Sequence, residues 1–317
     1  MRMQGPPGPK GASAEKIVQG PAGPPGPPGA GGGQVEKFYH AASAHAPVQG
    51  GCHWAYSGAD GPDSWGSICA GTFSNCAAGT SQSPIDVATG SLVTAAAAAT
   101  LGWSIPDTTA AQYVNYAKGS GGDTAYESFD GHTFNVEHIK ATFAYENVAY
   151  TLTHFEMHTR SEHTVDGEHS DLEIQFVHTT EDPAAANAKL IVAAFFKIEP
   201  GQGSPTFIRQ LAAAVPKLTG TPAGVVHIDF AEVAQTVMIG SLAHRGATAA
   251  SFTPNFKNYM AYQGSVTAPP CTEGVQWLLL RNPVYIYGED YAALHSLLGD
   301  NFRPVQPLDG RVVSSSV

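Results

Sequence analysis

Glycine recurs at every third position over much of the first 32 residues, and this register constrains the fold of that segment strongly. Counting in threes from Gly5 places glycine at positions 5, 8, 11, 20, 23, 26, 29 and 32, while Ala14 and Ile17 occupy the two slots that break the pattern. A collagen triple helix needs this spacing, because only a hydrogen side chain fits at the axis of three wound polyproline strands. The register predicts a collagen-like tail of polyproline type over residues 1–33.

The alternative for this tail is an extended Pro/Gly linker, because eight glycine triplets are few for an independently stable triple helix. The glycine phase nevertheless resumes at Gly20, a whole number of triplets after Gly11, which favours the collagen-like interpretation. We therefore expect residues 5–32 to associate with copies of themselves or with a similar chain, as a trimer or a higher assembly. Residues 34–49 are expected to be a linker.

Charge and hydropathy limit the function classes. The 317-residue chain carries 16 basic and 27 acidic side chains, and its net charge of −11 argues against nucleic acid as a partner. No unbroken apolar run approaches the ~20 residues that a membrane span needs, so no span is expected. Because 43% of the residues are hydrophobic, the chain can build a substantial core.

Segments with the pattern of β-strands follow the tail and predict a fold that is mainly β. Short helices are expected over Pro205 to Leu218 and Asp290 to Leu298, where apolar residues recur at intervals of three and four. No internal repeat or second core is evident, so residues 50–317 are predicted to form one domain. The expected strands are His132 to Ile139, Val148 to His158, Leu172 to His178, Leu190 to Ile198 and Val275 to Leu280.

Several motifs in this domain resemble one family closely. They lie in the family's order over roughly residues 50–312, and the family is the α-class carbonic anhydrases. The resemblance implies a single domain around a large, twisted, mainly antiparallel sheet, with a conical cleft that ends at zinc. The motifs are His53-Trp54-Ala55-Tyr56, Gly61-Pro62 with Trp65, Gln82-Ser83-Pro84-Ile85-Asp86, Gly131-His132-Thr133-Phe134-Asn135-Val136, Ser161-Glu162-His163-Thr164-Val165-Asp166-Gly167, Gly264-Ser265-Val266-Thr267-Ala268-Pro269-Pro270-Cys271 and Arg303-Pro304-Val305-Gln306-Pro307-Leu308.

The chain has four cysteines and no Cys-x-x-Cys motif, so the sequence alone permits two disulfides in three connectivities, or four buried thiols. The resemblance chooses between these, because secreted members of the family join cysteines at the positions of Cys76 and Cys271. Cys52 and Cys69 are then left to pair. Such bonds form in an oxidising compartment, so we expect an extracellular, secreted protein at the cell surface or in a matrix.

The resemblance also places the zinc ligands, and here the family pattern fails. In the enzymes two histidines at i and i+2 on one strand, and a third on the next strand, hold zinc and activate a bound water. The first two positions fall on Glu156 and His158 when the chain is aligned on the Ser161-Glu162-His163 motif. The third position falls on Gln175. We expect this degenerate site to bind zinc far more weakly than three imidazoles do, and we expect no resident cofactor.

Other cleft residues correspond to functional positions of the family. His132 matches the proton-shuttle histidine, Glu162 with Thr267 matches the pair that orients the zinc-bound hydroxide, and Glu173 matches the carboxylate behind the ligands. Ala268 replaces a threonine common in the family. These residues are interpreted as vestigial, since Glu162 and Thr267 can persist as a buried hydrogen-bonded pair of the scaffold.

The same correspondence gives the remaining polar and apolar positions of the cleft. His154 lies about 13 Å along the strand from His158, too far for both to bind one ion without a bulge, so a structural role is expected. A structural or solvated role is also expected for His163, His169 and His178. The apolar cleft walls are Val177, Ile191, Val266 and Trp277, which can hold a small neutral molecule or simply pack as core.

These observations predict an extracellular structural or assembly protein, a subunit of an oligomer or fibre, whose carbonic-anhydrase-like domain is catalytically inactive. One alternative is a carbonate dehydratase that hydrates carbon dioxide with zinc held by altered ligands, in which case zinc is the cofactor. Another is a module that binds a small molecule or a protein in the vacant cleft. The sequence favours the first class because two ligand positions are lost while the glycine register is kept.

Overall fold

A computed structural model describes the domain that follows the tail. The predicted collagen-like segment and the linker lie outside the described residues. Among the described residues no helix is both long and apolar enough to cross a membrane. The described residues are 52–94, 102–104, 125–137, 141–146, 148–182, 185, 188–218, 223–226, 232–233, 236–237 and 258–316.

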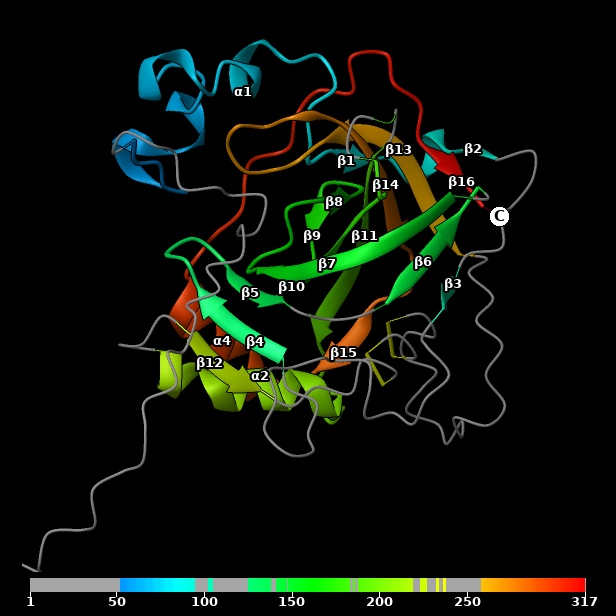
Figure 1. The fold of residues 1–317 in the computed structure, drawn as a ribbon. Helices are drawn as coiled ribbons and strands as arrows, with labels where there is room; N and C mark the ends of the chain where they lie inside the picture. Colours follow the sequence, from blue (N-terminus) through cyan, green and yellow to red (C-terminus); the bar gives the residue numbers. More distant parts are fainter. Residues whose placement is uncertain are drawn as a thin grey trace, which may run out of the picture. The chain divides into compact units, whose positions relative to one another are not determined.

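One large sheet dominates this domain (Figure 1). Its strands run in the order β12-β4-β5-β7-β10-β11-β14-β13-β16-β2, with β15 beside β11 and with β6 joining β3 to β7. Antiparallel pairs predominate, and parallel pairing joins β11 to β14, β11 to β15 and β16 to β2. The strands of this sheet are β2 (Val93–Thr94), β3 (Gly102–Ser104), β4 (Ala125–Phe129), β5 (Phe134–Glu137), β6 (Thr142–Tyr145), β7 (Val148–His158), β10 (Leu172–Thr179), β11 (Lys189–Ile198), β12 (Ala223–Val226), β13 (Tyr259–Ser265), β14 (Glu273–Leu280), β15 (Val284–Ile286) and β16 (Ser314–Ser315).

A second, small sheet and a few helices complete the described elements. The small sheet has the order β1-β8-β9. Helices α2 and α4 lie next to each other at the end of the domain where β12 and β15 are drawn (Figure 1). The elements are β1 (Asp86–Val87), β8 (Thr164–Val165), β9 (Glu168–His169), α1 (Asn75–Ala78), α2 (Thr206–Leu218), α4 (Gly288–Leu298) and the short 3-10 helices Gly58–Asp60, Pro62–Ser64, Cys69–Gly71 and Thr89–Ser91.

The two faces of the central strands have different chemistry because side chains alternate along a strand. On β7, Phe155 and Met157 belong to the main apolar core, together with Ile174 and Phe176 of β10. The alternate residues of β7 from His154 onward point to the other face and are polar, yet they are also buried. Both faces of these strands are therefore covered, and the polar face holds the candidate site.

Two disulfides cross-link the domain. Cys76 pairs with Cys271 at a Cα–Cα distance of 5.1 Å, and Cys52 pairs with Cys69 at 5.3 Å. These cysteines belong to a separate apolar cluster that includes Trp54 and Trp65. Both predicted pairings are confirmed.

The expected architecture is confirmed as well. Strands β7, β10, β11 and β14 lie where alternation predicts them, with ends that differ by no more than two residues. Within the expected strand from His132 to Ile139, β5 covers Phe134–Glu137, and residues 138 and 139 lie outside the described residues. The sheet is mainly antiparallel, as expected, and β11 runs parallel to both β14 and β15.

Candidate functional site

Polar side chains on one face of three adjacent strands form the centre of the site. Asn135 of β5, Glu156 of β7 and Gln175 of β10 are directly paired across the sheet. Residues paired in this way point to the same face. His158 follows Glu156 at i+2, shares that face and is paired with Glu173. The structure therefore brings the three predicted ligand positions together.

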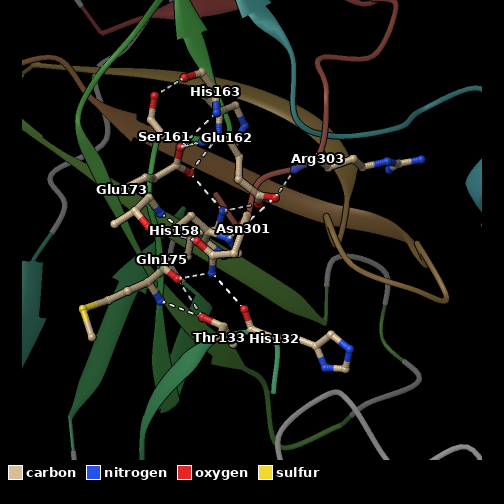
Figure 2. Close-up of polar contacts among 12 residues, drawn as sticks. His132, Thr133, His158, Ser161, Glu162, His163, Glu173, Gln175, Asn301 and Arg303 are labelled. Carbon is tan, nitrogen blue, oxygen red and sulfur yellow. Dashed lines mark hydrogen bonds and ion pairs between the residues drawn. The ribbon is translucent and has the colours of Figure 1, made fainter. Parts of the chain in front are cut away.

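Gln175 is fully buried and its amide points to the neighbouring carboxylates (Figure 2). Its Nε2 donates to Glu162 Oε2 at 2.8 Å and to Glu173 Oε1 at 3.0 Å. Both amide hydrogens are therefore engaged by carboxylate oxygens, because an amide nitrogen carries two of them. A histidine at this position would present a ring nitrogen to zinc. The Gln175 side chain instead links the carboxylates of Glu162 and Glu173.

The carboxylate of Glu162 has partners that differ from the expectation. Its Oε1 accepts from the backbone N–H of Arg303 at 2.9 Å, and its Oε2 accepts from Gln175. Within the described part of the chain no hydrogen bond joins Glu162 to Thr267, although Thr267 is buried. The partners of this carboxylate are instead the amide of Gln175 and the backbone N–H of Arg303. The hydroxide-orienting pair is thus not formed in this structure.

His158 is the one imidazole among the predicted ligands. Its Nδ1 donates to the backbone carbonyl of Asn301 at 2.8 Å and lies 3.6 Å from Glu162 Oε1. Burial acts to lower the pKa of His158, but the carboxylates of Glu162 and Glu156 outweigh it and raise that pKa above the ordinary value. The Nδ1 bond leaves Nε2 as the atom that faces the site.

A buried network anchors the far side of Gln175. Glu173 accepts from the backbone N–H groups of Glu162 and His163, each at 2.9 Å, and from His163 Nδ1 at 2.9 Å. Burial acts to raise the pKa of Glu173, yet the attraction and hydrogen bond of His163 outweigh it and lower the pKa. The network continues from His163 Nε2 to the Tyr262 hydroxyl at 2.6 Å, and from that hydroxyl to Ser83 Oγ at 2.8 Å. His163 is therefore a structural group.

His132 packs against Trp54 and so lies away from the site. Its ring stacks on Trp54 with centroids 3.7 Å apart, and its Nε2 lies 2.8 Å from the Trp54 carbonyl oxygen. In Figure 2 its imidazole points away from the cluster around Gln175. Tyr56, two residues beyond Trp54, packs edge-on against His158 with centroids 6.3 Å apart. The residues after Cys52 thus contact both histidines.

The predicted cleft walls pack as core. Val177, Ile191 and Trp277 are buried in one apolar cluster, and Val266 packs against it. A cavity of about 330 Å³ lies elsewhere, beside Tyr56. None of the four wall residues lines this cavity. Its lining residues are Tyr56, Ser57, Gly58, Gly61, Pro62, Asp63, Asp300, Phe302 and Pro304.

The remaining predicted residues have local partners. His154 Nδ1 lies 3.0 Å from the hydroxyl of Thr153, and His169 Nδ1 lies 2.6 Å from the backbone oxygen of Ser161. His178 is fully buried, and burial lowers its pKa to about 3. Ala268 is buried in the cluster that contains the disulfide of Cys271.

The donor set does not fit zinc. Among the described residues no group of three or more His, Cys, Asp or Glu side chains is placed to hold a metal ion. A catalytic zinc needs three protein ligands of that kind with an open fourth position. Here only His158 offers an imidazole, Glu156 offers a carboxylate, and the amide of Gln175 is bonded to two other carboxylates.

Two residues that position the site, Asn301 and Arg303, were not predicted from the sequence. Asn301 holds His158 through its carbonyl oxygen, and its Nδ2 donates to the carbonyls of His132 and Met157 at 3.0 and 2.9 Å. Arg303 binds Glu162 through its backbone. Backbone contacts of this kind carry no residue-type signal, although Arg303 does lie within one of the family motifs.

The large mixed sheet with few short helices has the fold of solved α-carbonic anhydrase structures. A family model described as eukaryotic-type carbonic anhydrase matches residues 60–317. The chain belongs to this family.

Individual relatives agree with this assignment. A carbonic anhydrase of Pectobacterium atrosepticum is 30% identical over 264 residues, which cover 82% of this chain and 90% of the relative. The carbonic anhydrase-related protein of Homo sapiens is 28% identical over 209 residues, or 59% of this chain and 63% of the relative. The structure of the α-carbonic anhydrase from Thermovibrio ammonificans with the inhibitor sulfanilamide has 27% identity and a TM-score of 0.63, covering 84% of this chain and all of the other.

Proposed function

We propose that this protein is an extracellular structural or assembly protein, a subunit of an oligomer or fibre, whose carbonic-anhydrase-like domain lacks zinc-dependent activity. The observation that carries the proposal is the orientation of Gln175. Its amide donates to Glu162 and Glu173 and so occupies the hydrogen-bonding groups that serve zinc chemistry in the family. Glu156 adds a charged oxygen where the family has an imidazole, which removes a second nitrogen ligand.

The assembly role rests on the glycine register of the tail. A triple helix formed by residues 5–32 gathers three globular domains at one end of a stalk. Ala14 and Ile17 crowd the axis, so Gly20 to Gly32 is the better-ordered half. Because the tail has few glycine triplets, its triple helix also needs stabilising contacts between the globular domains.

The extracellular location rests on the two disulfides. Structural disulfides persist in oxidising compartments and are rare in reducing ones. The Cys76–Cys271 bond joins residues 195 positions apart and spans most of the domain, so it stabilises the whole fold. Detection of free thiols at Cys76 and Cys271 in protein from its native source would contradict this assignment.

Metal analysis of the purified protein tests the inactive site. The zinc content, measured by inductively coupled plasma mass spectrometry after dialysis against trace zinc, is expected to be far below one ion per chain. A full equivalent of zinc that disappears in a His158→Ala variant would refute the proposal.

Sedimentation of the full chain tests the assembly role. Gly26→Val places a bulky side chain at the triple-helix axis, while Pro27→Ala is a neighbouring change at an outward position. We expect Gly26→Val to weaken association more than Pro27→Ala. If wild type sediments as a monomer, or if both variants associate as wild type does, the collagen-like interpretation of the tail is incorrect.

The second candidate function is a carbonate dehydratase with altered ligands. The retained His158, Glu162 and Glu173 favour it, as do relatives named carbonic anhydrase. A third candidate, a binding module, draws support from the cavity beside Tyr56. A hydration assay tests the second, and a thermal-shift screen of small molecules tests the third.

A further inference from the structure

We propose that the cavity beside Tyr56 binds a small organic cation, an ammonium group carried on an apolar body. The metal-ligand positions on β7 and β10 take no part in this binding. Such a site goes beyond the proposed assembly role, and it gives a ligand class to the binding alternative.

Two segments that are far apart in the chain line the cavity. Residues 56–63 contribute one set of lining residues, and residues 300–304 contribute the other. The volume is about 330 Å³, at the lower end of the ~300–1,000 Å³ that is typical of pockets for small molecules. The cavity therefore has the size for a small organic molecule.

The segment that contains Tyr56 is held in place by its neighbours. Trp65 Nε1 donates to the carbonyl oxygens of Ala55 at 2.9 Å and Asp60 at 3.1 Å. The Tyr56 ring packs edge-on against Trp54 and Trp65, with centroids 5.3 and 5.7 Å apart. A cavity that is already formed binds a ligand without the cost of ordering its own side chains.

Aromatic and proline side chains give the cavity apolar surface. Tyr56, Pro62, Phe302 and Pro304 are all among its lining residues. The ring of Phe302 already attracts a cation, since the guanidinium carbon of Arg160 lies 5.8 Å from its centroid. The lining therefore suits a ligand with an apolar body.

The charged residues that line the cavity are both acidic. They are Asp63 and Asp300, and none of the described lining residues is Lys, Arg or His. Asp300 has a partner, because His295 Nε2 lies 3.2 Å from its Oδ1. Asp63 has no hydrogen bond or ion pair with another residue in the part of the chain that the structure describes. Its carboxylate is thus available to pair with a cationic ligand.

The hydroxyl of Tyr56 senses a negative electrostatic potential. Burial raises the pKa of Tyr56 well above its ordinary value of 10.0, and nearby carboxylates, led by Glu162, raise it further. The guanidinium of Arg303 lowers this pKa, but its effect is smaller. Such a potential favours a cation over a neutral molecule of the same shape and disfavours an anion. A neutral aromatic molecule is the competing ligand, because apolar lining alone would bind it.

Indole N–H signals provide a local readout of binding. The full-length protein, labelled with ¹⁵N-tryptophan, has four tryptophans, whose signals are assigned by single substitutions to phenylalanine. Trp65 monitors the cavity through its contact with Tyr56, whereas Trp277 belongs to a different apolar cluster. We expect benzylammonium, at low salt and pH 7.5, to shift the Trp65 signal with a dissociation constant of about 10 mM or less, as for a fragment of this size. The Trp277 signal should not move.

Three matched probes test the ligand class. Benzyl alcohol and benzoate share the ring of benzylammonium, and methylammonium shares its charge. We expect each of them to bind at least about threefold more weakly than benzylammonium. Equal binding of benzyl alcohol or benzoate would overturn the assignment to a cation, and equal binding of methylammonium would overturn the apolar part of the proposal.

Two pairs of variants test the location. Asp63→Asn is expected to weaken benzylammonium about threefold to fivefold, the size of an exposed ion pair. Asp309→Asn, at an exposed carboxylate outside the cavity, should leave binding unchanged. Ser57→Phe places a ring in the cavity and should block binding, while Ser91→Phe, at an exposed serine outside it, should not. An unchanged Trp277 signal establishes that each variant is folded.

The outcomes are separable from those that test the proposed function. Absence of a Trp65 shift up to about 50 mM benzylammonium overturns the cation site. Equal effects of Asp63→Asn and Asp309→Asn, or of Ser57→Phe and Ser91→Phe, also overturn it. Neither the zinc content nor the sedimentation of the chain depends on this cavity, so each of these results leaves the proposed function untouched.

Discussion

Gln175 Nε2 lies 2.8 Å from Glu162 Oε2, so a residue at a metal-ligand position donates a hydrogen bond to the carboxylate that serves the bound hydroxide in the family. Under the proposed function, a glutamine at this position has two effects. It offers no ring nitrogen to a metal ion, and it binds the carboxylate that was expected to pair with Thr267. The remaining Glu162 oxygen is held by the backbone of Arg303, so the carboxylate is fixed from both sides.

Restoring both histidines is expected to rebuild zinc binding. The Glu156→His, Gln175→His double variant places three imidazoles on the paired strands β7 and β10 and releases Glu162 from the amide of Gln175. We expect one zinc per chain by mass spectrometry, against a trace amount in wild type. The matched control is Glu168→His with Gln202→His, which adds two histidines at exposed positions. Failure of the double variant to bind zinc while it remains folded would show that the scaffold itself has diverged.

The two disulfides are expected to stabilise the fold unequally. In the chain-entropy model a bond that closes 195 residues contributes about 5 kcal/mol, and one that closes 17 residues contributes about 3 kcal/mol. Cys76→Ala with Cys271→Ala should therefore lower the denaturant midpoint more than Cys52→Ala with Cys69→Ala. Urea unfolding followed by tryptophan fluorescence measures both. Equal midpoints would show that the short loop is as important to global stability as the long one.

Acid should destabilise the protein partly through His178. Burial lowers its pKa to about 3 from an ordinary 6.5, so the unfolded chain binds a proton that the folded chain does not. The associated stability is complete above pH 6.5 and is lost as pH falls toward 3, by at most about 1.4 kcal/mol per pH unit.

We therefore expect His178→Gln to flatten the dependence of the free energy of unfolding on pH in this window. His53→Gln, at an exposed position, serves as the control and should follow the wild-type slope. Urea titrations between pH 7 and pH 4 make the comparison. A variant with the same slope as wild type would mean that His178 becomes protonated without unfolding.

Glu173→Gln is expected to cost about 3–5 kcal/mol of stability, because it leaves the donors of a buried network facing an amide. Those donors are the backbone N–H groups of Glu162 and His163, the ring of His163 and the amide of Gln175. Glu168→Gln, an exposed neighbour in sequence, should change stability little. A loss below about 1 kcal/mol for Glu173→Gln would show that the network is not essential to the fold.

The pKa of Glu173 gives that prediction a pH signature. Because the folded-state pKa is lowered from 4.5, the stability it provides is present above pH 4.5 and is lost as pH falls through the folded value. Wild type should therefore lose this contribution on acidification, and Glu173→Gln should not.

Much of the fold was predictable because its strands carry a clear pattern. β7 and β10 alternate or run apolar over lengths that local propensity and burial both favour, and their ends follow from that pattern. β5 begins two residues later than predicted, since a run of strand-like residues does not show where pairing starts. The parallel pairing of β11 depends on contacts with strands more than 80 residues away, which local pattern does not encode.

Motif spacing predicted Glu156, His158 and Gln175 as ligand positions, and this assignment stays a prediction. Strand pairing does bring the three residues together, but their hydrogen bonds were not predicted. The partner of Glu162 was missed because a glutamine amide can turn in several directions, and only packing selects one. The contact between Trp54 and His132 was also not predicted, since it joins segments 78 residues apart.

The rate of carbon dioxide hydration by the wild-type protein, followed by stopped flow in buffer supplemented with zinc, tests the central claim most directly. The account predicts a rate indistinguishable from buffer with zinc alone, because Glu156 and Gln175 supply no nitrogen ligand and Glu162 is held by Gln175. A catalysed rate that is proportional to protein concentration and that His158→Ala abolishes would contradict the account.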